Sequence, residues 1–167
     1  MRLSETLLPE LDQEMATTRR LLERVPDDSL GWRPHDKSMT LGRLGTHVAE
    51  LPGFVAMILG GSEFDLTSRT SGYTPKTLDK HQEMLDLFDG NVRSARTAIE
   101  SAENEALMQP WTLRRGEQVI FTLPRIAALR SMFFSHTIHH RGQLSVYLRL
   151  NDVPVPSIYG PSADEAV

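Results

Sequence analysis

Apolar side chains recur at helical spacing in four long segments of the chain. They follow steps of three and four residues over 3–22, 41–58 and 78–99, and they fill the stretch from Pro124 to Leu150. A stripe at this spacing covers one face of an α-helix and is buried against neighbouring elements. The pattern therefore predicts four amphipathic helices of about 20 to 25 residues, packed as an all-α four-helix bundle.

Capping and helix-breaking residues set the expected bounds of the second helix. Ser38 or Thr40 can cap its start, because a short hydroxyl side chain accepts a hydrogen bond from the first turn. Pro52 removes one backbone donor inside the helix and should bend it near Val48. We expect the helix to stop at the glycine pair at 60–61.

The connection between the second and third helices is long. About fifteen residues, from Gly60 to Thr74, lack helical periodicity, and Pro75 suits the first turn of the third helix. Such a connection can cross the bundle from end to end, which argues against simple up-down-up-down wiring. Before the fourth helix, β-forming residues flank an Arg-Gly-Glu turn between Gln109 and Leu123, which predicts a short β-hairpin. With no linker or repeat, we expect residues 1–167 to form a single domain.

Composition narrows the classes of function. The 167 residues carry a net charge of -4 with no cluster of basic side chains, which argues against a nucleic-acid partner. The chain has no cysteine, so a metal site would need histidine, carboxylate or water ligands. The first residues, 1–5, lack the long apolar run of a signal peptide or membrane span, and we expect a cytoplasmic protein without a membrane partner.

Two histidines in the fourth predicted helix are the strongest candidate metal ligands. His136 and His140 are four residues apart, so both lie on one face of the helix, among apolar neighbours. This spacing lets two imidazoles bind one ion. Buried histidines that hydrogen-bond to backbone or carboxylates would show the same spacing, so the pair alone leaves both interpretations open.

A third histidine favours the metal interpretation. His47 lies on the inward face of the second predicted helix, among leucines. Three neutral imidazoles from two helices can hold a divalent ion and leave at least one position for water or substrate. If the second and fourth helices are not neighbours, His47 is instead a buried histidine satisfied by other partners.

Other polar residues near these histidines could orient them. Gln143 and Tyr147 share their face, although Tyr147 could equally be a packing residue, and His139 lies on its flank. Glu50, one turn after His47, could orient an imidazole or act as a base, although a solvated surface carboxylate is the simpler interpretation. Arg141 lies opposite the histidine face, where we expect solvent, an ion pair or a subunit contact.

Five sequence blocks are similar to a known family in content and in order. They are Trp32-Arg33-Pro34-His35, then Ser38-Met39-Thr40-Leu41-Gly42, then His47-Val48-Ala49-Glu50-Leu51, then 136–143 (HTIHHRGQ), and finally 159–165 (YGPSADE). With these blocks the chain resembles the DinB-like, or YfiT-like, superfamily of metal-binding helical bundles. The blocks span nearly the whole length of the chain.

The resemblance implies several properties of the protein. It implies a four-helix bundle with down-up-up-down wiring, a homodimer, and one divalent ion held by His47, His136 and His140. Relatives catalyse thiol-dependent transfer and isomerisation with low-molecular-weight thiols such as bacillithiol or mycothiol. The DinB name refers to DNA-damage induction and implies no DNA binding.

Two classes of function follow from these observations. In the first, an ion in an open three-histidine site serves a thiol-dependent S-transferase or a hydrolase that acts on a small-molecule substrate. Zn²⁺ or Ni²⁺ is the first expectation for the ion, and Fe²⁺, Mn²⁺ or Co²⁺ are alternatives. A thiol would have to come from a cosubstrate, since the chain has no cysteine. In the second class, the bundle binds a metal or a small ligand without catalysis.

Overall fold

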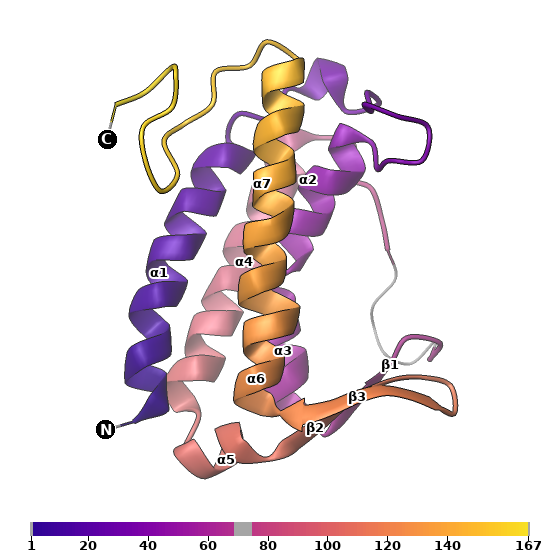
Figure 1. Cartoon of the computed structure of the whole chain (residues 1–167), viewed down its shortest axis with the longest axis vertical. Coiled ribbons are helices and arrows are strands. Elements are labelled where there is room, and N and C mark those ends of the chain that lie inside the picture. The colour runs from indigo at the N-terminus through magenta and orange to yellow at the C-terminus, as the bar shows by residue number, and fades with distance from the viewer. Residues whose placement is uncertain (1, 69–74, 167) are drawn as a thin grey trace.

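A computed structural model describes residues 2–68 and 75–166 and shows a bundle of helices with a small sheet at one end (Figure 1). The predicted all-helical bundle is confirmed. The helices are α1 (Leu3–Leu22), α2 (Leu41–Glu50), α3 (Gly53–Gly60), α4 (His81–Ser101), α5 (Asn104–Met108), α6 (Arg125–Leu129) and α7 (Ser135–Leu150), with a short 3-10 turn η1 (Asp27–Ser29) and a π-helical turn η2 (Arg130–Phe134).

The helices form four rods that bury one apolar face each. α4 packs against α1, α2 and α3, and α7 packs against α1 and α2. The rod formed by α2 and α3 runs in the same direction as α4, while α1 and α7 run in the opposite direction (Figure 1). This order requires the long connection before α4 to return along the bundle, as its length predicts. The core between the rods includes Leu11, Phe88, Phe133 and Leu144.

The second rod is divided at Pro52. α2 begins after Thr40, whose side-chain oxygen accepts a hydrogen bond from Arg43 N at 3.1 Å, as expected of a cap. The predicted bend near Val48 is wrong in position. α2 is regular past Val48, and its last helical hydrogen bond runs from Leu51 N to His47 O at 3.2 Å. Pro52 cannot donate the next bond, so the helix breaks there and α3 resumes at Gly53.

Part of the predicted irregular connection is a strand. β1 (Glu63–Asp65) pairs in parallel with β2 (Pro110–Arg115), which pairs antiparallel with β3 (Gln118–Pro124). The expected hairpin is formed by β2 and β3, and β1 adds a third strand to give the order β1-β2-β3. Three residues are too few to show a period of two, and the partner of β1 is distant in sequence. Residues 69–74, the end of the predicted connection, lie outside the described residues.

Two helix bounds differ from the prediction. The third helix begins at His81 rather than at Pro75, because His81 N donates to Asp27 Oδ1 at 2.6 Å and thereby fixes the first turn. The fourth helix is one rod, but it contains the π turn η2 between α6 and α7. A π turn widens a helix by one residue and is often found beside functional sites.

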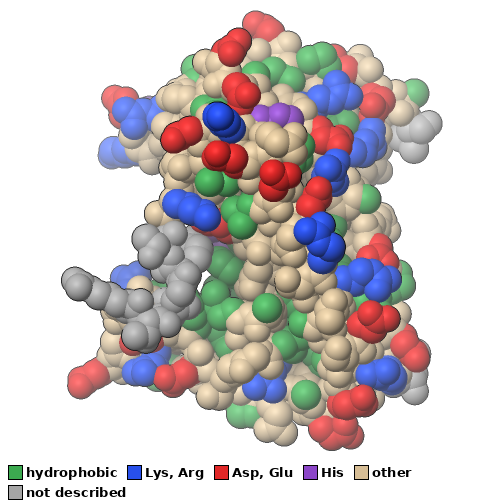
Figure 2. Space-filling view, turned by 180° about the vertical axis from the view of Figure 1, so that it is seen from behind, with side chains coloured by type: hydrophobic (Ala, Val, Ile, Leu, Met, Phe, Trp, Pro, Cys, Tyr) green, Lys and Arg blue, Asp and Glu red, His purple; other side chains and the backbone are tan. Residues whose placement is uncertain are grey.

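The surface mixes both signs of charge. Acidic and basic side chains are interspersed over the face seen in Figure 2. Within the described ranges, 2–68 and 75–166, no helix has both the length and the apolar character needed to cross a membrane.

Candidate metal centre

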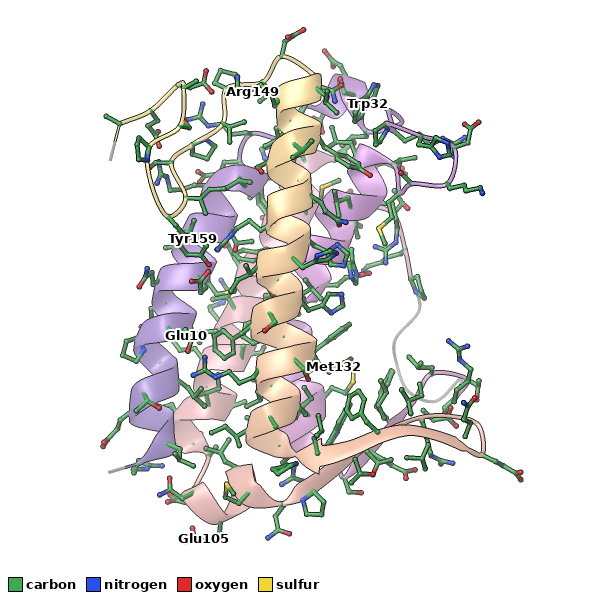
Figure 3. All side chains as sticks on the ribbon, viewed as in Figure 1. Glu10, Trp32, Glu105, Met132, Arg149 and Tyr159 are labelled. Atoms are coloured by element: carbon green, nitrogen blue, oxygen red, sulfur yellow. The ribbon has the colours of Figure 1, made fainter. Side chains whose placement is uncertain are left out.

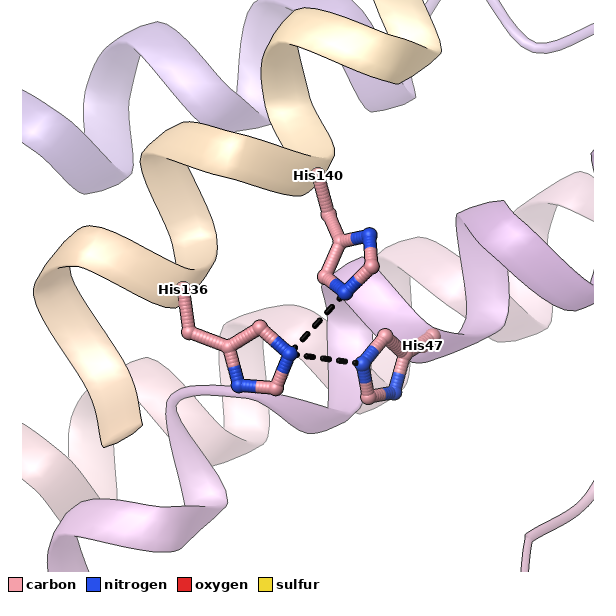
Figure 4. Close-up of side chains that lie close together, drawn as sticks. All are labelled: His47, His136 and His140. Atoms are coloured by element: carbon pink, nitrogen blue, oxygen red, sulfur yellow. Dashed lines mark hydrogen bonds between the residues drawn. The ribbon is translucent and has the colours of Figure 1, made fainter. Parts of the chain in front are cut away.

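Three histidine side chains meet between α2 and α7. His47 projects from the last turn of α2, and His136 and His140 project from the first two turns of α7 (Figure 4). The Nε2 atom of His136 lies 2.9 Å from Nε2 of His140 and 3.4 Å from Nε2 of His47. One possible ligand atom from each of the three lies within 4.8 Å of the others. Packing of α2 against α7 thus brings together residues 89 positions apart in the chain.

These separations fit ligands of one metal ion. Two nitrogens about 2.05 Å from one zinc ion are about 3.3 Å apart at a tetrahedral angle and about 2.9 Å apart at a right angle. The two observed separations of 3.4 and 2.9 Å lie at these values. The donor set also fits, because neutral imidazole nitrogen binds zinc, nickel and other first-row ions.

The second ring nitrogen of each histidine faces an oxygen. His140 Nδ1 lies 2.7 Å from Gln143 Oε1, and His136 Nδ1 lies 3.3 Å from the carbonyl oxygen of Met132. His47 Nδ1 is buried, 3.6 Å from a carboxylate oxygen of Glu50. The oxygens beside His136 and His140 accept hydrogen bonds and so favour a proton on Nδ1 of each ring. The Glu50 oxygen is too distant for a hydrogen bond, but its negative charge favours a proton on His47 Nδ1. In the neutral tautomer this leaves the three Nε2 lone pairs directed at one another.

Glu50 belongs to the site and is not the solvated surface carboxylate of the simpler interpretation. It is 8% exposed, and its Oε2 accepts hydrogen bonds from both terminal nitrogens of Arg43, at 3.1 and 3.2 Å. Burial by itself raises the pKa of Glu50, but the neighbouring His47 and Arg43 outweigh it and hold the pKa below its usual value. A charged carboxylate beside His47 is consistent with the carboxylate–histidine–metal arrangement of many metalloproteins.

Burial keeps the other two imidazoles neutral. His140 is 9% exposed, and desolvation lowers its pKa from 6.5 to about 4. Desolvation also lowers the pKa of the half-buried His136, and the nearby His47 adds to the effect. Neutral imidazole is the form that binds metal, so both side chains are ready to bind an ion at neutral pH.

The remaining predicted neighbours lie at different distances from the cluster. His139 is exposed, with its ring centroid 4.8 Å from that of His140. Tyr147 donates to the carbonyl oxygen of Met39 at 3.3 Å, and its ring packs edge-on against Trp32 at 5.5 Å. The structure thus places Gln143 against a candidate ligand and Tyr147 against the loop before α2.

Arg141 is buried in an ion pair, so of its three expected environments the ion pair is confirmed and a position at the solvent is wrong. It is 1% exposed, and its guanidinium lies 2.6 Å from Glu14 Oε2 of α1. It also donates to Tyr159 OH at 2.5 Å and to Thr18 Oγ1 at 3.2 Å. The side of α7 opposite the histidines therefore faces α1 and the C-terminal tail.

Among the residues that the structure describes, no carboxylate oxygen lies with the three Nε2 atoms as a fourth possible ligand. Glu63 pairs with Arg114, and Asp65 accepts hydrogen bonds from Thr67 and Gly116. The acidic pair in the C-terminal tail, at 164–165, pairs with arginines at 149 and 20. The undescribed residues 69–74 contain no histidine, aspartate or glutamate in sequence.

The sequence did not identify three residues around the cluster as parts of a site. Arg43 holds Glu50, Met132 supplies a carbonyl to His136, and the Phe54 ring lies 6.4 Å from the His136 ring. The spacing of Arg43, His47 and Glu50 on one helix carries a signal, since steps of four and three residues place them on one face. No comparable signal marks a backbone carbonyl.

Comparisons with known proteins agree with this architecture. The sequence pattern of the DinB superfamily matches residues 10–144. An uncharacterized protein of Bacillus subtilis (strain 168), YrdA, is 26% identical over 152 residues, which cover 91% of this chain and 85% of that protein.

Two solved structures share the fold. A crystal structure of a DinB-like protein from Bacillus cereus ATCC 10987 superposes with a TM-score of 0.72 at 20% identity, covering 93% of this chain and 97% of that one. A DinB-like protein of Bacillus subtilis, YjoA, superposes with a TM-score of 0.69 at 18% identity, covering 89% and 96%. At these identities the likeness concerns the fold alone.

Proposed function

We propose that this chain, which belongs to the DinB superfamily, is a metal-dependent enzyme in which His47, His136 and His140 hold one divalent ion. The proposed reaction is transfer of a small thiol to an electrophilic small molecule, with hydrolysis as the variant in which water replaces the thiol. Zn²⁺ or Ni²⁺ is the proposed ion, and Fe²⁺, Mn²⁺ or Co²⁺ would suit the same ligands.

One observation carries the proposal. Each of the three imidazoles has its Nδ1 next to an oxygen, and the three Nε2 atoms converge. Nitrogen lone pairs directed at one another repel unless a proton or a cation lies between them. A single cation satisfies all three at once, whereas one proton can serve only two.

The number of protein ligands favours an open site. Structural zinc sites usually have four protein ligands, whereas catalytic sites have three and leave a position for water or substrate. A divalent ion held there would supply Lewis-acid chemistry, which lowers the pKa of a water or thiol bound to it. The chain has no cysteine, so in the transfer reaction the thiol must be a cosubstrate.

The chain's own residues would set up this chemistry by orientation and exclusion of water. Glu50, Gln143 and the Met132 carbonyl hold the imidazoles in the tautomer that binds metal. Phe54 and Met132, which lie beside His136, exclude water and lower the local dielectric, and this strengthens the electrostatic interactions of a bound substrate.

The first test is metal analysis of the purified, metal-loaded protein. We expect about one divalent ion per chain in the wild type and a large loss in the His47→Ala and His140→Ala variants. His139→Ala is the matched control, because His139 is exposed in the same motif and should retain the ion. Equal metal content in all four proteins would refute the site.

The second test concerns the reaction. The metal-loaded protein is incubated with an alkylating electrophile and 2-mercaptoethanol, and loss of free thiol is followed over time. We expect faster loss than with metal-free protein and no acceleration in the His140→Ala variant. A metal-loaded wild type that consumes neither thiol nor electrophile would leave the noncatalytic bundle as the better account.

A further inference from the structure

A cavity lined only by apolar side chains lies beside the histidine cluster. It has a volume of about 40 Å³ and lies between α3, the sheet and the π turn η2. Figure 3 shows Met132 on the last rod, whose η2 turn packs against α3. The lining consists of Phe54, Met57 and Ile58 from α3, Phe64 and Leu66 from β1 and the residue that follows it, Trp111 from β2, and Met132.

Two residues belong both to the cavity and to the surroundings of the candidate ligands. The ring of Phe54 lies 6.4 Å from the ring of His136, centroid to centroid. The Met132 carbonyl lies 3.3 Å from His136 Nδ1, while the Met132 side chain lines the cavity. Phe54 and Met132 therefore connect the lining of the cavity with the surroundings of His136.

The apolar lining determines which kind of molecule can bind in the cavity. A charged or hydrogen-bonding group placed there would lose its water without gaining a partner, which costs free energy. Cavities with apolar walls exclude water and take apolar molecules, and each buried square ångström of apolar surface contributes about 25 cal/mol. Leu66, 44% exposed, gives the cavity a side that a ligand can reach from solvent.

We propose that this cavity binds the hydrocarbon part of the electrophilic substrate, a short alkyl or alkenyl chain that suits its small volume, while the reacting carbon lies at the histidines. The proposal rests on the proposed function and adds the class of substrate to it. In the transfer, sulfur forms a bond to that carbon as its bond to the leaving group breaks. The leaving group departs with the bonding electron pair, and the thiol proton passes to the buffer.

A binding measurement tests the cavity without any turnover. Xenon, an apolar atom that dry cavities bind, is titrated into metal-free protein and followed by ¹²⁹Xe NMR. Leu66→Trp places a larger ring at the accessible side of the cavity, and Leu150→Trp is the matched control, because Leu150 is 56% exposed at the far end of α7. We expect binding by the wild type and the control, and at least about a tenfold weaker affinity in Leu66→Trp, equivalent to about 1.4 kcal/mol.

Absence of xenon binding to the wild type, or equal binding by both variants, would overturn the cavity proposal. Circular dichroism of each variant verifies that it is folded. Since this measurement needs neither metal nor thiol, its result is independent of the proposed function.

A comparison of two electrophiles links the cavity to the reaction. Allyl chloride and chloroacetate lose the same leaving group, but only allyl chloride carries a short apolar chain. We expect metal-loaded wild type to favour allyl chloride in kcat/KM, and Leu66→Trp to lose that preference while it still consumes chloroacetate. A wild type that favours chloroacetate would contradict the inferred substrate class. If neither electrophile reacts faster than with metal-free protein, the proposed function fails and the xenon titration alone decides the cavity.

Discussion

At the scale of single residues, the candidate site depends on the groups that face the Nδ1 atoms of the three imidazoles. His47 differs from the other two histidines because its Nδ1 faces a charged side chain, Glu50, at 3.6 Å. Arg43 holds that carboxylate in place through two hydrogen bonds. A negative charge behind an imidazole raises its basicity and fixes its tautomer, and both effects strengthen binding to a cation.

Glu50→Gln tests this role. The amide retains the shape of the carboxylate and removes its charge, so we expect the metal dissociation constant to rise by about 10- to 100-fold, the usual effect of losing such a partner. Competition with a chromophoric chelator measures the constant. Glu83→Gln, at an exposed position on α4, is the control and should leave it unchanged. Equal constants for Glu50→Gln and wild type would show that the carboxylate does not support the site.

The lowered pKa of His140 predicts how the metal-free protein responds to acid. In the unfolded chain a histidine titrates near 6.5, whereas burial lowers the pKa of His140 to about 4 in the folded state. Between these values only the unfolded chain binds the proton. Stability from this group is therefore complete above pH 6.5 and is lost as the pH falls toward 4.

We expect denaturant unfolding of the metal-free wild type to show this loss, and His140→Gln to show a shallower one. Each free energy of unfolding is measured at several pH values with a chelator present. Parallel pH curves for the two proteins would contradict the inferred contribution of His140.

The spacing of residues along the chain predicted the three candidate ligands but not all of their partners. The helical angles of His47, His136 and His140 come directly from the spacing of apolar neighbours, and the structure brings all three together. Glu50 was misjudged because a charged side chain is usually exposed, and its partner Arg43 makes burial tolerable. A periodic pattern gives the direction of a side chain but not the residue it meets.

At the scale of elements, Arg141 joins α1, α7 and the C-terminal tail. Its guanidinium pairs with Glu14 and lies over the ring of Tyr159, 5.0 Å from the centroid. The sequence placed Arg141 opposite the histidines, which is where it lies, but could not show that α1 and the tail cover that face. Removing one partner of a buried ion pair leaves the other charge without compensation.

Arg141→Met should therefore lower the free energy of unfolding by about 3–5 kcal/mol. Arg149→Met is the matched control on the same helix: its ion pair with Asp164 is exposed, so we expect a loss below about 1 kcal/mol. Chemical denaturation compares the two variants with wild type. Equal losses would show that burial of the Arg141 pair contributes nothing special to the contact between α1 and α7.

Element bounds were predictable where one residue controls them. Thr40 caps α2 as expected, and Pro52 does interrupt the second rod, although four residues beyond the expected bend near Val48. β1 and the start of α4 at His81 depend instead on partners far along the chain, β2 and Asp27. A local sequence pattern cannot predict element bounds that depend on such distant partners.

At the scale of the whole molecule, the homodimer implied by the family resemblance stays a prediction. α7 exposes three apolar side chains: Val146 and Leu150, one turn apart and each 56% exposed, and Ile138, two turns before Val146 and 37% exposed. We expect light scattering to give the mass of two chains and Val146→Glu to reduce it to one. Val119→Glu, equally exposed on β3 at 57%, is the control. A wild type with the mass of one chain would contradict the dimer.

The bundle as a whole makes the candidate site possible, because the division of the second rod at Pro52 and the packing of α2 on α7 set three imidazoles around one point. Helical periodicity and family resemblance predicted the rods and their wiring. The apolar cavity beside the site could not be predicted, since its walls come from α3, two strands and η2, which are distant in sequence.

The central claim is that three histidines hold one ion and leave a position open for a thiol. Absorption spectroscopy of the cobalt(II)-loaded protein during titration with 2-mercaptoethanol tests it most directly. The account predicts a new thiolate-to-cobalt charge-transfer band that saturates at about one thiol per ion and is absent in His140→Ala. A cobalt spectrum that 2-mercaptoethanol leaves unchanged, or one that is identical in His140→Ala, would contradict it.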